Sequence, residues 1–113
     1  MSTTSTGRAA EDAAAKYLLS QGYEILEQNW RTRWCEIDIV AKSGEVVTFF
    51  EVKYRKSEQW GSGLEYITSK KLSQMRFAAD FWVSSHNWSG DYRLGAIEVT
   101  GTTFQITNVL PEI

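Results

Sequence analysis

The segment Cys35–Lys53 reads CEIDIVAKSGEVVTFFEVK, and it decides the fold class. Apolar and polar residues alternate in Cys35–Ala41, and Val46–Lys53 is rich in valine and phenylalanine, so both stretches are predicted strands. Ser43 and Gly44, which lie between them, are typical turn residues. The segment therefore predicts an antiparallel β-hairpin with a Ser43-Gly44 turn.

Helices and further strands are expected on both sides of this hairpin. Small and apolar residues recur at helical spacing in Gly7–Gln21, and a second helix is expected from Thr68 or Ser69 to about Ser85. Three more strands are predicted, namely Tyr23–Trp30, Tyr92–Thr100 and Thr103–Val109. The order α, β, β, β, α, β, β predicts an α/β or α+β domain with a mixed central sheet flanked by helices.

Length and composition narrow the classes of protein. The chain has 113 residues, so we expect a single domain over residues 7–113, after a disordered tail at residues 1–6. The single cysteine, Cys35, and the single histidine, His86, exclude an internal disulfide and a zinc site built on these residue types. Any metal ion would be held by oxygen. The formal net charge of −2 means that nucleic-acid binding needs a local basic patch.

The apolar runs are far shorter than the roughly 20 residues that span a bilayer. The first six residues are polar, and the alanine-rich stretch after them carries charges, unlike a signal peptide. These features predict a cytoplasmic protein without a membrane partner.

The hairpin strands carry acidic residues at strand spacing. Residues two apart in a strand share a face, so Glu36 and Asp38 are expected on one side of the sheet, with Ile37 and Ile39 on the other.

Glu51 and Lys53 are expected to share a face in the next strand. A two-residue turn at Ser43-Gly44 would place Glu36 opposite Glu51, and Asp38 opposite Phe49. If the register of the two strands slips by a pair of residues, each side chain keeps its face of the sheet, and Asp38, Glu51 and Lys53 stay together on one side.

Facing carboxylates repel one another unless a cation lies among them. Mg²⁺ prefers oxygen ligands and commonly uses one or two carboxylates, a role that suits Asp38 and Glu51. Lys53 would then orient or deprotonate a water, or stabilise the charge of the phosphorane, so the set indicates phosphodiester hydrolysis. The alternative for Asp38, Glu51 and Lys53 is a salt-bridge network on an exposed sheet face. Glu36 is either a third ligand of the metal or an ordinary exposed charge.

The first helix adds Glu11, which lies at the centre of the stripe formed by Ala14, Ala15 and Leu18 and should face inward. Glu11 would reach the metal directly or through a water. The alternative is an acid that only complements the helix dipole.

The residues above belong to a set of motifs that occur in this order along the chain: Gly7-x3-Glu11, Tyr17-Leu18, Gly22-Tyr23, Asn29-x-Arg31, Glu36-Ile-Asp38-Ile-Val-Ala, Phe50-Glu51-Val-Lys53-x-Arg55, Gly61 and Lys71. From Gly7 to about Val99 the chain thereby resembles the bacterial YraN-type family. That family belongs to the restriction-endonuclease-like PD-(D/E)xK superfamily, which also contains the archaeal Holliday-junction resolvases.

The resemblance implies a restriction-endonuclease-like αβββαβ core. In it Asp38, Glu51 and the Val52 carbonyl would bind Mg²⁺ or Mn²⁺, Lys53 would be catalytic, and Glu11 would be an outer ligand. Lys71 would contact phosphate. Relatives with this core often act as dimers on structured DNA, so the resemblance leaves a homodimer open.

Six basic residues against two acidic ones, Glu58 and Glu65, lie between Lys53 and Arg76. This strip would hold a phosphate backbone, or it is a solvated face. The nucleic-acid-binding candidates are Arg31, Arg55, Lys56, Lys70, Lys71 and Trp60. Trp60 would stack on a base, or it is a packing residue. Trp30, Trp34 and Trp82 are expected in the core or a dimer contact.

The sequence therefore predicts a metal-dependent nuclease. The resemblance implies structured or single-stranded nucleic acid as its substrate, with DNA favoured over RNA. Its catalytic residues would be Glu11, Asp38, Glu51 and Lys53. The alternative is a non-catalytic nucleic-acid-binding module that keeps the nuclease fold. A third reading is a protein-interaction domain with tryptophan-rich surfaces.

Overall fold

The structure is a computed structural model, and it describes residues 5–57 and 67–113. The elements are α1 (Ser5–Ser20), β1 (Glu24–Arg31), β2 (Glu36–Ser43), β3 (Val46–Arg55), α2 (Ser69–Ser85), β4 (Asp91–Thr100) and β5 (Gln105–Leu110). This order confirms the predicted α, β, β, β, α, β, β succession.

The strands form one five-stranded sheet in the order β1-β2-β3-β4-β5. Neighbouring strands are antiparallel except β3 and β4, which are parallel because α2 connects them as a crossover. The sheet is therefore mixed, as predicted.

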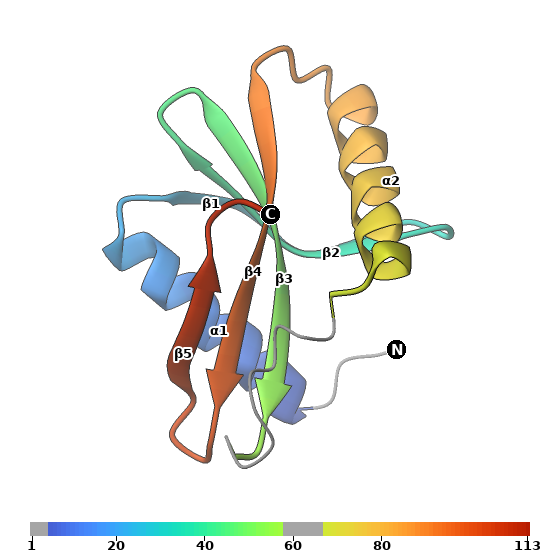
Figure 1. The fold of residues 1–113 in the computed structure, drawn as a ribbon. Helices are drawn as coiled ribbons and strands as arrows, with labels where there is room; N and C mark the ends of the chain where they lie inside the picture. Colours follow the sequence, from blue (N-terminus) through green and yellow to red (C-terminus); the bar gives the residue numbers. More distant parts are fainter. Residues whose placement is uncertain (1–4, 58–66) are drawn as a thin grey trace.

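The two helices cover opposite faces of the sheet (Figure 1). On one face Ala10, Ala14 and Leu18 of α1 pack against Ile39 and Phe50. On the other face, residues of α2 that include Met75, Ala79 and Trp82 pack against residues of the sheet such as Val40 and Phe49. The fold is thus three layers with a core on each side of the sheet. Neither helix of the described chain is long and apolar enough to cross a membrane.

The first helix ends where the sequence places a glycine. Tyr23 donates its N–H to the Leu18 carbonyl and Gly22 donates to Leu19, while Gly22 has a φ of +93°. This pairing is a Schellman cap, which favours glycine at the left-handed position. The helix begins at Ser5, two residues before the predicted start, so Ser5 and Thr6 of the expected disordered tail are helical instead. Residues 1–4 of that tail lie outside the described residues.

The hairpin loop differs by one residue from the prediction. Ser43 pairs with Val46, so the loop residues are Gly44 and Glu45 rather than Ser43 and Gly44. Gly44 has a φ of +60°, which a type II′ turn requires at its first central position. The turn places glycine where the left-handed backbone is needed, and this shifts the whole register.

Gly95 lies against the ring of Phe50 on the neighbouring strand. A Cβ atom at position 95 would stand 2.7 Å from a Phe50 ring carbon and 2.9 Å from the Leu110 carbonyl oxygen. The close approach of β4 to this ring therefore requires glycine.

Candidate functional site

The strands β2 and β3 part at Asp38. Their paired residues run from Ser43↔Val46 to Ile39↔Phe50, and beyond this point the side-chain Oδ2 of Asp38 accepts the Val52 N–H at 2.8 Å. The carboxylate thus accepts the N–H hydrogen bond that a backbone carbonyl of β2 would accept if the two strands stayed paired. Asp38 is held in place by the end of the ladder.

Because of the shifted turn, Val40 rather than Asp38 lies opposite Phe49, so the predicted partners of Glu36 and Asp38 are wrong. The predicted alternation also fails here. Ile37 packs in the core on the α2 side and Ile39 in the core on the α1 side, although they are two residues apart. Strand alternation holds only while the strand stays regular, and the break falls where the pairing of β2 with β3 ends at Ile39.

The predicted site residues nevertheless meet in one cavity of about 360 Å³. The N-terminal half of α1 contributes Glu11, β2 contributes Asp38, β3 contributes Glu51 and Lys53, and the first turn of α2 contributes Lys71. The Val52 backbone lies in the same lining. Side chains from four elements therefore converge at the point where the hairpin strands separate.

Four acids form the carboxylate cluster of this site. Glu11, Asp38 and Glu51 line the cavity, and Glu36, which is exposed, acts on Glu11 and Asp38 through its charge. Burial and then the charge of Glu51 raise the pKa of Asp38 to about 7, while the Val52 hydrogen bond acts in the opposite direction. Burial, followed by the charges of Glu36 and Asp12, raises the pKa of Glu11, against the effect of Arg31 and Arg8. The cluster therefore carries unfavourable negative charge that a cation would offset.

Lys71 supplies part of the opposing charge. Its Nζ lies 2.9 Å from Glu51 Oε2, and its backbone N–H donates to the Thr68 side chain, which caps α2 as predicted. Lys70 and Lys71 lie in the first turn of a helix that has no acid there. Because the positive end of the helix dipole disfavours cations, this placement costs stability and favours a bound anion.

Asp38 and Glu51 offer oxygen donors of the kind that a hard divalent cation prefers. Within residues 5–57 and 67–113, no three Asp, Glu, His or Cys side chains are placed to cage a metal ion. The oxygens of Asp38 and Glu51 would then serve an ion that keeps several waters, as Mg²⁺ does. Among the described residues, neither His nor Cys lines this cavity, and such a lining does not suit zinc.

The other predicted nucleic-acid contacts lie in different settings. Arg31 is exposed and lies close enough to Glu11 to affect its pKa. Lys56 is exposed after β3, and Lys70 lines a neighbouring cavity. Trp60 lies outside the described residues.

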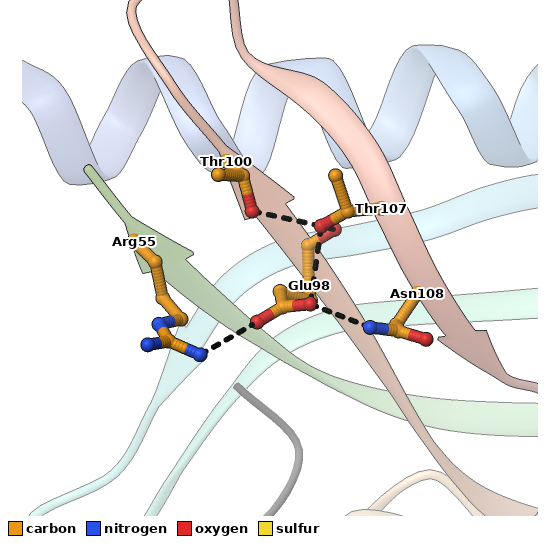
Figure 2. Close-up of polar contacts among 5 residues, drawn as sticks. All are labelled: Arg55, Glu98, Thr100, Thr107 and Asn108. Carbon is orange, nitrogen blue, oxygen red and sulfur yellow. Dashed lines mark hydrogen bonds and ion pairs between the residues drawn. The ribbon is translucent and has the colours of Figure 1, made fainter. Parts of the chain in front are cut away.

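Arg55 is held by a buried glutamate that the sequence analysis did not single out (Figure 2). Glu98 is 2% exposed, and its Oε2 lies 3.5 Å from Arg55 Nη1, whose side chain is 17% exposed. Asn108 and Thr107 of β5 donate hydrogen bonds to Glu98 Oε1 at 2.7 and 3.1 Å. Glu98 therefore ties β3, β4 and β5 together beyond Lys53. The signal in the sequence was a lone acid in the apolar stretch Gly95–Thr100.

The tryptophans divide between the core and the surface. Trp82 is buried and Trp30 is half-buried, as expected of core residues. Trp34 is 64% exposed, so it is not a core residue, and its alternative place in a dimer contact stays a prediction. It lies in the polar turn between β1 and β2, whose backbone leaves it outside the sheet.

Comparisons with known proteins give a consistent result. The model of the uncharacterised protein family UPF0102 matches residues 10–99. A UPF0102 protein from Sulfurihydrogenibium sp. (strain YO3AOP1) is 39% identical over 102 residues, which cover 89% of each chain. One from Cytophaga hutchinsonii is 38% identical over 95 residues, which cover 84% of each chain. One from Parafrankia sp. is 44% identical over 80 residues, covering 71% of this chain and 68% of the relative.

Proposed function

We propose that this chain, which belongs to the uncharacterised protein family UPF0102, is a metal-dependent nuclease that hydrolyses phosphodiester bonds in structured or single-stranded DNA. The observation that carries the proposal is the cavity in which Glu11, Asp38, Glu51 and Lys53 converge. The family name states no activity, so these residues are the support for a nuclease.

A fold of this kind supports the proposal. The αβββαββ order and the mixed sheet match the core that the resemblance to restriction-endonuclease-like proteins implies. We propose further that the chain belongs to that superfamily and that it acts in the cytoplasm.

Asp38 and Glu51, with the Val52 carbonyl, would hold Mg²⁺ or Mn²⁺, and Glu11 would act as an outer ligand. When bound, the ion supplies positive charge that stabilises the phosphoryl oxygens in the transition state. The hydrogen bond from Val52 fixes the Asp38 carboxylate, so this ligand is oriented before any ion arrives.

Lys53 would orient the attacking water and stabilise charge on the phosphorane. It follows Glu51 by two residues on β3 and lines the same cavity. Lys71 and Lys70, at the N-terminus of α2, would bind the phosphate backbone beside the reacting bond. A module that only binds phosphate gains nothing from buried carboxylates, and this favours catalysis over binding alone.

The test is a gel assay of labelled single-stranded, duplex, flapped and four-way-junction DNA, and of RNA, with Mg²⁺, Mn²⁺ or EDTA. We expect metal-dependent products from the wild type and none from Glu51→Gln or Lys53→Ala. Lys16→Ala is the matched control, because it removes one exposed lysine of α1 outside the cavity.

Undiminished cleavage by folded Glu51→Gln protein would refute the assignment. Shifted bands without products from the wild type would instead support the non-catalytic binding module.

A further inference from the structure

We propose that a second cavity, next to the carboxylate cluster, binds an unpaired nucleobase, so that single-stranded or frayed nucleic acid is the substrate class. This inference rests on the proposed function for the identity of the bond that is cut. The cavity has a volume of about 520 Å³, within the range of small-ligand sites.

The cavity lies between α2 and the connection from β1 to β2, which reaches across that helix (Figure 1). Trp34 and Phe77 contribute to its lining from these two elements. Glu51 and Lys71 line both this cavity and that of the carboxylate cluster. A strand whose phosphate lies at Lys71 would therefore have a base within reach of Trp34 and Phe77.

The two aromatic rings are unusually exposed, at 64% for Trp34 and 52% for Phe77. Both lie against Phe81, with ring centroids 5.8 Å from Trp34 and 6.2 Å from Phe77. Exposed rings held side by side form an apolar patch of the kind that marks a binding surface.

The backbone that carries Trp34 is fixed. The Thr32 hydroxyl accepts the N–H groups of Trp34 at 3.0 Å and Cys35 at 3.1 Å, and Thr32 donates its own N–H to the Cys35 carbonyl. The ring therefore projects from an ordered turn, and a base would stack on it without a large ordering cost.

Charge favours nucleic acid over a protein partner as the occupant. The Arg33 guanidinium lies 5.2 Å from the centre of the Trp34 ring, and Lys70 lines the cavity at the first turn of α2. The acids in the lining, Glu36 and Glu51, both belong to the carboxylate cluster. Aromatic rings flanked by cations are the arrangement that binds single strands through stacking and backbone contacts.

Duplex DNA would not use this site, because a paired base is stacked inside the helix and its face is not available to Trp34. The site would therefore discriminate between paired and unpaired nucleic acid without reading sequence.

The experiment measures binding by fluorescence anisotropy in EDTA, so that cleavage does not interfere. The probes are a labelled oligothymidine of about 12 nucleotides, in the size range of single-strand sites, and a blunt duplex. Trp34→Ala and Phe77→Ala remove the rings, and Trp34→Phe keeps one. Leu19→Ala is the matched control, because Leu19 is 57% exposed on α1 and lies outside the cavity.

We expect each ring-removing variant to bind oligothymidine at least about 5-fold more weakly, the loss typical of one stacked base. Trp34→Phe and Leu19→Ala should keep the wild-type affinity, and duplex binding should be the same in all variants. Thermal melting checks that each variant is folded, which the exposure of both side chains favours.

Equal oligothymidine binding by the wild type and both ring-removing variants would overturn the inference, as would a wild type that prefers the duplex or binds no single strand. So would a wild-type dimer in sedimentation that Trp34→Ala dissociates while DNA binding is unchanged, because the rings would then be a protein interface. If the ring-removing variants bind oligothymidine more weakly but the wild type cleaves no nucleic acid, the nuclease is refuted and the base site is kept. If the wild type cleaves and the ring-removing variants bind oligothymidine as the wild type does, the base site is refuted and the nuclease is kept.

Discussion

Replacing Asp38 with asparagine should stabilise the metal-free protein at neutral and alkaline pH. The pKa of Asp38 is raised from its ordinary 3.8 to about 7, chiefly by burial and by the charge of Glu51. That difference corresponds to about 4 kcal/mol of unfolding free energy once Asp38 is ionised. Asparagine keeps an oxygen that accepts the Val52 N–H, so the substitution removes the charge and little else.

The pH dependence follows from the direction of the shift. An acid whose folded pKa is raised costs nothing below the unfolded pKa near 4, and its cost grows until the pH passes the folded pKa near 7. The stability of Asp38→Asn relative to wild type should therefore rise between about pH 4 and pH 7 and then stay level.

Urea unfolding in EDTA, repeated from about pH 4 to pH 9, measures this difference. Asp91→Asn is the control, since it removes the charge of an exposed aspartate at the start of β4. A stability difference that does not change with pH, or an Asp38→Asn protein that is less stable than wild type at about pH 8, would show that Asp38 is not held among repelling charges.

Three further predictions concern the same region. Mg²⁺ or Mn²⁺ should raise the melting temperature of the wild type, and the rise should be absent from Asp38→Asn and Glu51→Gln, since a ligand that binds only the folded state stabilises it; an equal rise in all three would rule out this site. Lys71→Met should bind Mn²⁺ more tightly and oligonucleotides more weakly, because Lys71 competes with a cation for Glu51 and supplies charge for phosphate. Calorimetry measures the first effect and fluorescence anisotropy the second, and weaker binding of both ligands would contradict this prediction. Glu98→Ala should lower the unfolding free energy by about 2 kcal/mol or more, because Arg55 and the β5 donors lose their acceptor. Urea unfolding measures this loss, with the exposed-site variant Glu112→Ala as the control, and equal stability of the two variants would refute the prediction.

The elements and their order were predictable because the pattern of apolar residues changes period along the chain. The C-terminal end of α1 and the cap of α2 followed from Gly22 and Thr68, whose preferences are local. The meeting of Asp38, Glu51 and Lys53 was also predictable, because neighbouring strands bring such residues together even when the register shifts.

The hairpin register was not predictable from turn composition alone. Ser43, Gly44 and Glu45 allow two loops that differ by one residue, and the need for a left-handed glycine at the first loop position selects between them. The break in alternation at Asp38 depends on the Val52 hydrogen bond, which no local pattern encodes.

The cavity lined by Trp34 and Phe77 was missed for a different reason. Trp34 and Phe77 are far apart in the sequence, and each alone resembles a core residue. The structure brings both exposed rings into the lining of one cavity, and no local pattern in the sequence indicates this.

The contact between Gly95 and Phe50 also restricts how homologous chains can diverge. A side chain larger than hydrogen at position 95 would collide with the Phe50 ring, which precedes Glu51 on β3. A smaller residue at position 50 would not relieve this restriction, because the backbone carbonyl oxygen of Leu110 would still stand 2.9 Å from the new Cβ atom. Glycine should therefore persist at position 95 even in homologous chains whose residue 50 is smaller.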